Sequence, residues 1–142
     1  MNVSARTEYA CLAVLQLAAS YGTGEPVRVR AIAQAHGIPS RFLVQIMLQL
    51  KGAGLVASTR GAAGGYQLIR DPVDITLADV MYVIEGGGDG VTRSCSHETP
   101  QARALLGLWN DVHRVQREML AGTSIQELLE RSRSASDMMY YI

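Results

Sequence analysis

The chain has 142 residues, of which 48% are hydrophobic and 18% charged, and its formal net charge is zero. This composition excludes a disordered polar chain and is sufficient for one hydrophobic core plus an oligomerisation element. The longest apolar run, Tyr9 to Leu15, is too short for the roughly 20 residues of a bilayer-spanning helix and favours a first helix over a signal peptide. Cys11 and Cys95 give no disulfide framework, which fits a reducing cytoplasm.

The zero net charge conceals two oppositely charged halves. Residues 1–72 contain seven Lys or Arg and three Asp or Glu, so their net charge is 7 − 3 = +4, and residues 73–142 carry −4. Six of the seven basic residues are Arg, whose planar guanidinium suits bidentate contacts with phosphate and guanine. The N-terminal half is therefore predicted to meet an anionic partner, and nucleic acid is the commonest large one.

Three helices are predicted in the N-terminal half. Val3–Ser20 is amphipathic, Val29–His36 is short and ends at Gly37, and Arg41–Lys51 follows a tight turn. Two short helices joined by a glycine-containing turn are typical of a helix-turn-helix. The positions predicted to face the core are Ala10, Val14, Leu17, Ala18, Ile32, Ala33, Leu43, Ile46, Met47 and Leu50.

A basic hairpin is predicted after the third helix. Leu55–Thr59 and Tyr66–Arg70 indicate two strands, and the segment between them, RGAAGG, spans Arg60 to Gly65. Glycines allow a tight hairpin tip and a close approach of backbone to a ligand. A helix-turn-helix followed by such a hairpin is a winged helix, in which Arg60 would enter a narrow groove or hold a phosphate.

Three stretches resemble the Rrf2 family of bacterial transcription regulators. They are SARTEYACLAVLQLA at Ser4–Ala18, LKGAGLVASTRGAAGGYQLIRDP at Leu50–Pro72 and ITLADVMYVIEG at Ile75–Gly86. The resemblance implies a dimeric winged-helix protein that binds operator DNA, with the third helix in the major groove and the wing arginine in the minor groove. The residues expected at DNA are Ser4, Arg6, Arg28, Ser40, Arg41, Gln45, Arg60, Gly61, Gly64, Gly65 and Tyr66.

One departure from the family concerns the third helix. The family often has Tyr-Leu-Glu-Gln where this chain has Phe42-Leu43-Val44-Gln45. Val44 removes a carboxylate that could accept a hydrogen bond from cytosine, so the operator sequence cannot be taken from relatives.

The C-terminal half is predicted to hold the dimer interface. Residues 101–122 form a long helix, and its apolar positions recur at spacings of three and four, which favours packing against a second copy over packing only within the chain. The predicted dimer seam consists of Leu105, Leu108, Trp109, Val112, Val115 and Met119. The expected fold is thus mainly α with a small β-hairpin wing: a winged helix-turn-helix domain at residues 1–72, a dimerisation and sensor region at 73–133 with a loop at 86–100, and a tail at 134–142.

The loop before the long helix carries the cluster ligands in many Rrf2 proteins, where three cysteines hold an iron–sulfur cluster. Here the loop contains only Cys95, and the last family ligand positions hold Arg103 and Leu106. We therefore expect no cofactor and no metal site. Two alternatives stay open: thiol-redox sensing by Cys95, and a cluster shared across the dimer through Cys95, His97 and Glu8.

The chain ends in Met139-Tyr140-Tyr141-Ile142. A cluster-free repressor of cysteine metabolism within the family ends similarly, and that resemblance implies docking of the tail to cysteine synthase, whose substrate cleft accepts C-terminal isoleucine peptides. A free carboxylate beside apolar side chains suits such capture. The last helix is predicted over Ile125–Arg131, with Ser132–Ser136 as a tether. The alternative is that the tail folds onto its own dimer.

No enzyme is expected, because His36, His97 and His113 are scattered and no nucleophile or metalloprotease motif occurs. A protein-binding adaptor that does not bind DNA is the alternative from another class, and it leaves the basic hairpin unexplained. The sequence predicts a cytoplasmic DNA-binding regulator without a membrane segment.

Overall fold

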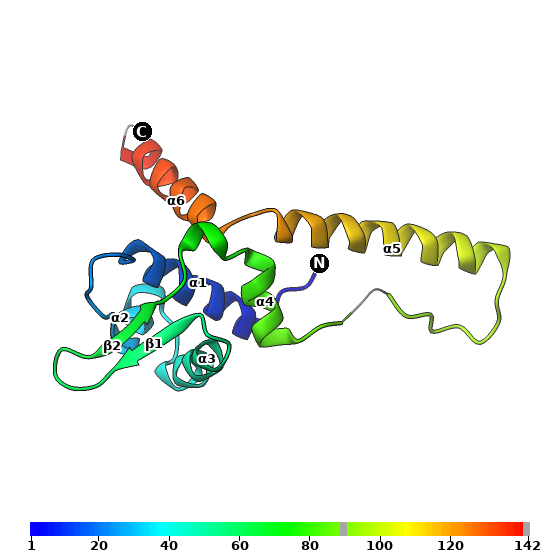
Figure 1. The fold of residues 1–142 in the computed structure, drawn as a ribbon. Helices are drawn as coiled ribbons and strands as arrows, with labels where there is room; N and C mark the ends of the chain where they lie inside the picture. Colours follow the sequence, from blue (N-terminus) through cyan, green and yellow to red (C-terminus); the bar gives the residue numbers. More distant parts are fainter. Residues whose placement is uncertain (89–90, 141–142) are drawn as a thin grey trace.

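The computed structural model describes residues 1–88 and 91–140, with the side chains of 137–140 outside the description. The elements in chain order are α1 (Ala5–Ala19), α2 (Val29–His36), α3 (Ser40–Gly52), β1 (Val56–Thr59), β2 (Gly65–Leu68), the 3-10 turn η1 (Pro72–Asp74), α4 (Leu77–Glu85), α5 (Pro100–Ala121) and α6 (Ile125–Tyr140). Figure 1 shows a body formed by α1 to α4 and the hairpin, from which α5 projects. The expected fold class, mainly helical with a small hairpin wing, is confirmed.

The three predicted N-terminal helices are present within one or two residues of their expected bounds. All ten positions predicted to face the core are buried. The predicted glycine stop of α2 is also confirmed, since Gly37 adopts a left-handed conformation with φ of 66°. The 3.6-residue period was a reliable guide here because each helix buries one continuous apolar side.

The wing is a two-stranded antiparallel hairpin. Its register pairs Val56 with Leu68 and ends with Thr59 opposite Gly65. A second backbone pairing fastens the wing to the segment before α2: the N–H groups of Val27 and Tyr66 each donate to the other residue's carbonyl at 2.8 Å. The wing therefore has a fixed base and an exposed tip at Arg60.

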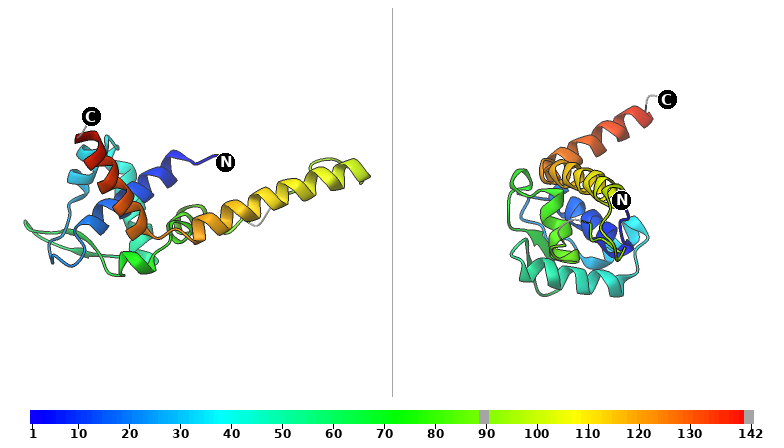
Figure 2. Two further views of the ribbon diagram at one scale, coloured as in Figure 1. Left: turned by 90° about the horizontal axis from the view of Figure 1, so that it is seen from above. Right: turned by 90° about the vertical axis from the view of Figure 1, so that its right-hand side faces the viewer.

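The start of α6 completes the core of the N-terminal body. The N–H of Ile125 donates to the carbonyl of Ile75 at 2.8 Å, and the N–H of Leu77 donates to Thr123 at 2.9 Å. Ile125 and Leu129 are buried in the same cluster as the residues of α1 and α3. Figure 2 shows α6 crossing over α1 from above. The predicted domain division at residue 72 therefore does not coincide with a division of the hydrophobic core.

The predicted end of the last helix at Arg131 is wrong. Helix α6 continues through Ser132–Ser136, the segment interpreted as a tether, to Tyr140. Serine and alanine are tolerated within a helix once its first turns are packed, and an ion pair between Arg131 and Glu127 at 2.9 Å adds support one turn earlier. Of the predicted tail, Tyr141 and Ile142 lie outside the described residues.

Helix α5 is covered by the rest of the chain on one side only. Its half-buried residues are Ala102, Leu106, His113, Gln116 and Leu120, and none of its residues is fully buried. The N–H of Val91 donates to the Asn110 side chain at 3.1 Å, so the preceding loop runs back along this helix. In the described part of the chain, no helix combines the length and apolarity required to cross a bilayer.

Candidate nucleic-acid interface

The outward face of α3 is the centre of the candidate interface. Leu43, Ile46, Met47 and Leu50 form its core side and are completely buried. At 100° per residue, Arg41, Gln45 and Leu48 lie on the opposite side. Ser40, Arg41, Val44 and Gln45 are all exposed. The sequence pattern predicts these four residues and Gln49 as the solvent face of the helix. The prediction is confirmed for the four but not for Gln49, which is half-buried and accepts a hydrogen bond from Arg6.

The first turn of α3 is not capped by a side chain. Pro39 occupies the cap position. The Phe42 N–H donates to the Pro39 carbonyl at 3.1 Å, and the helix dipole gives this end of the 13-residue helix a partial positive charge that favours an anion. The Arg41 guanidinium lies over the ring of Phe42, 5.0 Å from its centroid, which positions the charge beside the first turn.

The wing is held next to α3 by a side-chain contact. Lys51, in the last turn of α3, donates to the hydroxyl of Ser58 on β1 at 2.8 Å. The hairpin tip that follows exposes Arg60. In Figure 1 the hairpin lies next to α2 and α3, and its tip extends outward from the body.

Two wing glycines are required by close backbone contacts. A Cβ on Gly64 would lie 2.2 Å from the Thr59 carbonyl oxygen, and one on Gly65 would lie 2.5 Å from that of Val27. Gly65 also has φ of +148°, which other residues rarely adopt. These contacts close the tip and attach the wing to the body. A direct contact of Gly61, Gly64, Gly65 or the half-buried Tyr66 with DNA stays a prediction.

Ser4, Arg6 and Arg28 are exposed residues near helix starts. The hydroxyl of Ser4 caps α1 by accepting from the Thr7 N–H at 3.2 Å. The guanidinium of Arg6 donates to the side-chain carbonyl of Gln49, which joins the start of α1 to α3. Arg28 occupies the cap position of α2. The structure thus gives Ser4 and Arg6 supporting roles that sequence reasoning missed, and their contact with DNA stays a prediction.

The predicted dimer seam is exposed along α5. Its large side chains retain between 47% and 67% of their accessible surface: Leu105, Leu108, Trp109, Val112, Val115 and Met119. This side lies roughly a quarter turn from the half-buried side of the helix. Packing of α5 within its own chain therefore does not account for the seam, because it uses Leu106 and Leu120 instead.

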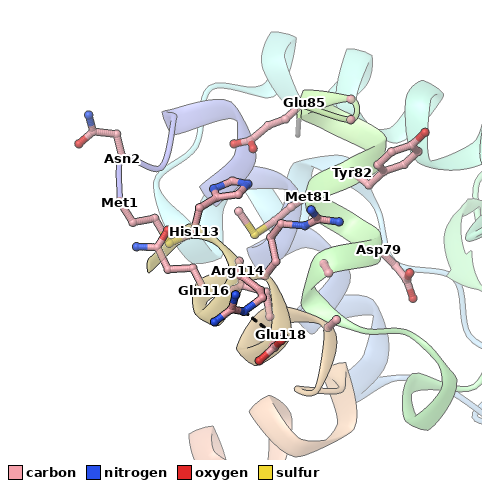
Figure 3. Close-up of a pocket in the computed structure, with 17 residues that line it drawn as sticks. Met1, Asn2, Asp79, Met81, Tyr82, Glu85, His113, Arg114, Gln116 and Glu118 are labelled. Carbon is pink, nitrogen blue, oxygen red and sulfur yellow. Dashed lines mark ion pairs between the residues drawn. The ribbon is translucent and has the colours of Figure 1, made fainter. Parts of the chain in front are cut away.

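A cavity of about 1100 Å³ lies between α4, the C-terminal half of α5 and the N-terminal residues. Figure 3 shows Glu85 from α4 and His113 from α5 among the side chains that line it. The Nε2 atom of His113 is buried without a hydrogen-bond partner among the described residues. The Glu85 carboxylate also accepts a hydrogen bond from the hydroxyl of the buried Thr7 at 2.7 Å, which connects α4 to α1.

The two cysteines differ in environment. Cys11 is partly buried on α1, and the pKa of its thiol is raised to about 11. The larger cause is burial, and the smaller is the negative charge of the nearby Glu85 carboxylate. Cys95 is exposed in the loop before α5, and its thiol lies 3.5 Å from the His97 carbonyl oxygen. Cys11 is therefore a packed, unreactive thiol, whereas Cys95 is open to solvent.

Comparisons with known proteins agree on one family. Residues 3–131 match the model of the Rrf2 family, described as an iron-dependent transcriptional regulator. The chain is 35% identical over 131 residues to a helix-turn-helix-type transcriptional regulator of Mycobacterium tuberculosis, covering 90% of this chain and 81% of that one. It is 32% identical over 143 residues to the transcriptional regulator CymR of Bacillus subtilis, covering all of both chains.

The fold agrees as well. The solved structure of B. subtilis CymR, described as the global cysteine regulator of that organism, matches with a TM-score of 0.81 at 30% identity, covering 92% of this chain and 98% of that one. The family and the relatives are transcriptional regulators and not enzymes.

The family description names iron, but the residues of this chain do not fit an iron–sulfur cluster. Such clusters are usually held by four cysteine thiolates, and the whole chain has two cysteines. One of these, Cys11, has a raised thiol pKa, which opposes the thiolate form that ligates iron. Among the side chains that the structure describes, in residues 1–88 and 91–136, no three from His, Cys, Asp or Glu are grouped to hold a metal ion.

Proposed function

Because the chain belongs to the Rrf2 family of transcriptional regulators, we propose that it is a cytoplasmic repressor that binds operator DNA as a homodimer. The proposed repressor needs no cofactor. One observation carries this proposal. The outward face of α3, with Arg41 and Gln45, and the wing tip, with Arg60, are exposed on one body and joined through the contact of Lys51 with Ser58. An adaptor that does not bind DNA would have no use for this combination.

The proposed docking places α3 in the major groove. Its uncapped first turn faces a phosphate, and Ser40, Arg41 and Gln45 reach base edges, where arginine recognises guanine and glutamine recognises adenine. Arg60 enters the adjacent minor groove or holds a phosphate beside it. Ser4, Arg6 and Arg28 support this docking from the starts of α1 and α2.

The DNA-binding proposal is tested by measuring the affinity of the full chain for duplexes selected from a random pool, over a range of salt concentrations. Wild type should lose affinity steeply as salt rises, and Arg60→Ala should weaken binding and reduce the salt slope by about one unit if Arg60 holds a phosphate. Arg133→Ala, on the exposed part of α6, is the matched control and should bind as wild type does. Absence of salt-dependent duplex binding would refute the proposal and favour the adaptor.

The homodimer is proposed from the exposed apolar seam of α5. An uncovered row of side chains on a 22-residue helix is costly in water and suits a second copy, which buries the same row in return. Two copies would present two α3 helices to half-sites about one helical turn of DNA apart, roughly 34 Å.

The regulated process is proposed to be cysteine metabolism, through docking of the C-terminal tail to cysteine synthase. Support comes from the likeness to CymR, which is 32% identical and aligns over the full length of both chains. The described part of α6 adds support, since residues 130–136 are exposed beyond the buried Leu129. Residues 130–136 are therefore not covered by the core and are accessible to a partner.

The tail proposal is tested by titrating the full chain and a form ending at Met138 against cysteine synthase, with O-acetylserine as competitor. Only the full chain should bind, and O-acetylserine should displace it. Both forms should bind the same operator equally, which controls for folding. Equal binding by the two forms, or none by either, would refute docking through Met139, Tyr140, Tyr141 and Ile142.

Cys95 supports a second candidate signal, thiol oxidation, because it is exposed in the loop before the proposed dimer helix. Oxidant should then change the operator affinity of wild type and leave Cys95→Ser unchanged. Equal responses of the two proteins would exclude this thiol as the sensor.

A further inference from the structure

The outward side of α3 contains apolar side chains that folding does not require. Leu48 is 57% exposed and Val44 is 48% exposed, although the core side of the same helix is complete and fully buried. Leu48 lies directly opposite that core side, in line with Arg41 and Gln45 at spacings of four and three residues. Among the described residues it is therefore positioned for an external contact.

The surroundings of Val44 and Leu48 indicate what makes that contact. Arg41 precedes them on the same face, Lys51 follows in the last turn of α3, and Arg60 extends from the neighbouring wing. An apolar strip within a cationic frame complements a surface that has apolar groups between anionic ones. The major groove of DNA has this character, since thymine methyl groups are the apolar groups on its base edges and phosphates border them.

We propose that Val44 and Leu48 contact thymine 5-methyl groups, so that each operator half-site has A·T pairs under α3. This inference rests on the proposed function and specifies its sequence preference. The rise of a helix separates the two residues by about 6 Å along α3, close to two base steps of about 3.4 Å. Gln45 lies between them and can pair with adenine, so all three side chains select the same kind of base pair.

The test removes single methyl groups from the DNA. In a duplex selected by the full-length protein, each thymine is replaced in turn by uracil, which lacks only the 5-methyl group, and the Kd is measured at one salt concentration. Uracil should weaken binding about fourfold at one or two positions in each half-site, as expected for one buried methyl group. At all other positions the change should be small.

Protein variants then assign each methyl group to a side chain. Val44→Ala should no longer distinguish thymine from uracil at one sensitive position, and Leu48→Ala at another. Both residues are exposed, so these variants should fold normally. Val73→Ala is the matched control, because Val73 is 60% exposed but lies on η1, outside α3. It should show the same thymine preference as wild type.

The possible outcomes distinguish failure of the methyl contacts from failure of the proposed DNA binding. No selected duplex at all would refute DNA binding and the inference together. Tight, salt-dependent binding with uracil tolerated at every position would overturn only the methyl contacts. Uracil sensitivity that persists unchanged in both alanine variants would also overturn them, because the methyl group would then act through the shape of the DNA.

Discussion

Replacement of Leu108 by alanine is expected to weaken the dimer without unfolding the protomer. Leu108 lies in the middle of the exposed seam and retains 60% of its accessible surface. Complete burial of a leucine contributes about 1.5–3 kcal/mol, so covering the part that is still exposed contributes about 0.9–1.8 kcal/mol per protomer. A two-fold interface contains the residue twice, which gives about 1.8–3.6 kcal/mol, or a dimer Kd raised roughly 20- to 450-fold.

Sedimentation equilibrium over a wide concentration range measures this dimer Kd, and circular dichroism checks that helix content is unchanged. Val73→Ala provides the control, because its side chain is equally exposed on η1 and outside the seam. A change in Kd no larger for Leu108→Ala than for Val73→Ala would refute the seam. So would a wild-type protein that is monomeric at micromolar concentration.

Three further predictions concern the Cys11 thiol, the wing and the packing of α1. Burial raises the folded-state pKa of Cys11 from 9.0 to about 11, so the thiol of the unfolded chain ionises at lower pH than that of the folded chain. The contribution of the neutral Cys11 thiol to stability is therefore present below pH 9 and is lost as the pH rises from 9 to 11. Urea unfolding of wild type at pH 8 and pH 10.5 should show a larger loss than that of Cys11→Ala, and equal losses would contradict the buried thiol. Gly64→Ala should distort the wing and reduce operator affinity at least tenfold in an anisotropy titration, because its Cβ would lie 2.2 Å from a backbone oxygen. Gly88→Ala is the control: Gly88 has open space around it, so this variant should bind as wild type does. Thr7→Val should lower the free energy of unfolding by about 1.5–3 kcal/mol by removing the hydrogen bond to Glu85, and Glu85→Gln, which keeps an acceptor, should cost less in the same urea titration.

The local elements of the N-terminal half could be predicted because each has a signal within a few residues. Helices α1 to α3 each have one apolar side, Gly37 ends α2, and the glycine-rich tip separates two short strands. The exposed candidates on α3 and the wing followed from the same patterns, since a residue opposite the buried side of a helix must face outward. The resemblance to the Rrf2 family, confirmed by the comparisons, added the expectation that α3 and the wing contact DNA.

Contacts between distant segments were beyond such reasoning. Nothing near Ile125 indicates that it completes a core built mainly from residues 10–80, because that contact depends on the backbone pairing of residues 75–77 with 123–125. The continuation of α6 through Ser132–Ser136 was missed for a related reason. A polar, serine-containing segment has weak helix propensity, and the turns of α6 packed before it decide its conformation.

The sequence by itself therefore determined the winged-helix elements, the charge of the half that contains them, and the apolar rows on α3 and α5. The tertiary structure decided what each row is available for. It filled one side of α3 with core contacts and left Val44 and Leu48 exposed, and it half-buried Leu106 and Leu120 of α5 while leaving Leu108 and its neighbours uncovered. Periodicity shows that a helix has an apolar side, but only the three-dimensional contacts show whether the chain itself covers that side.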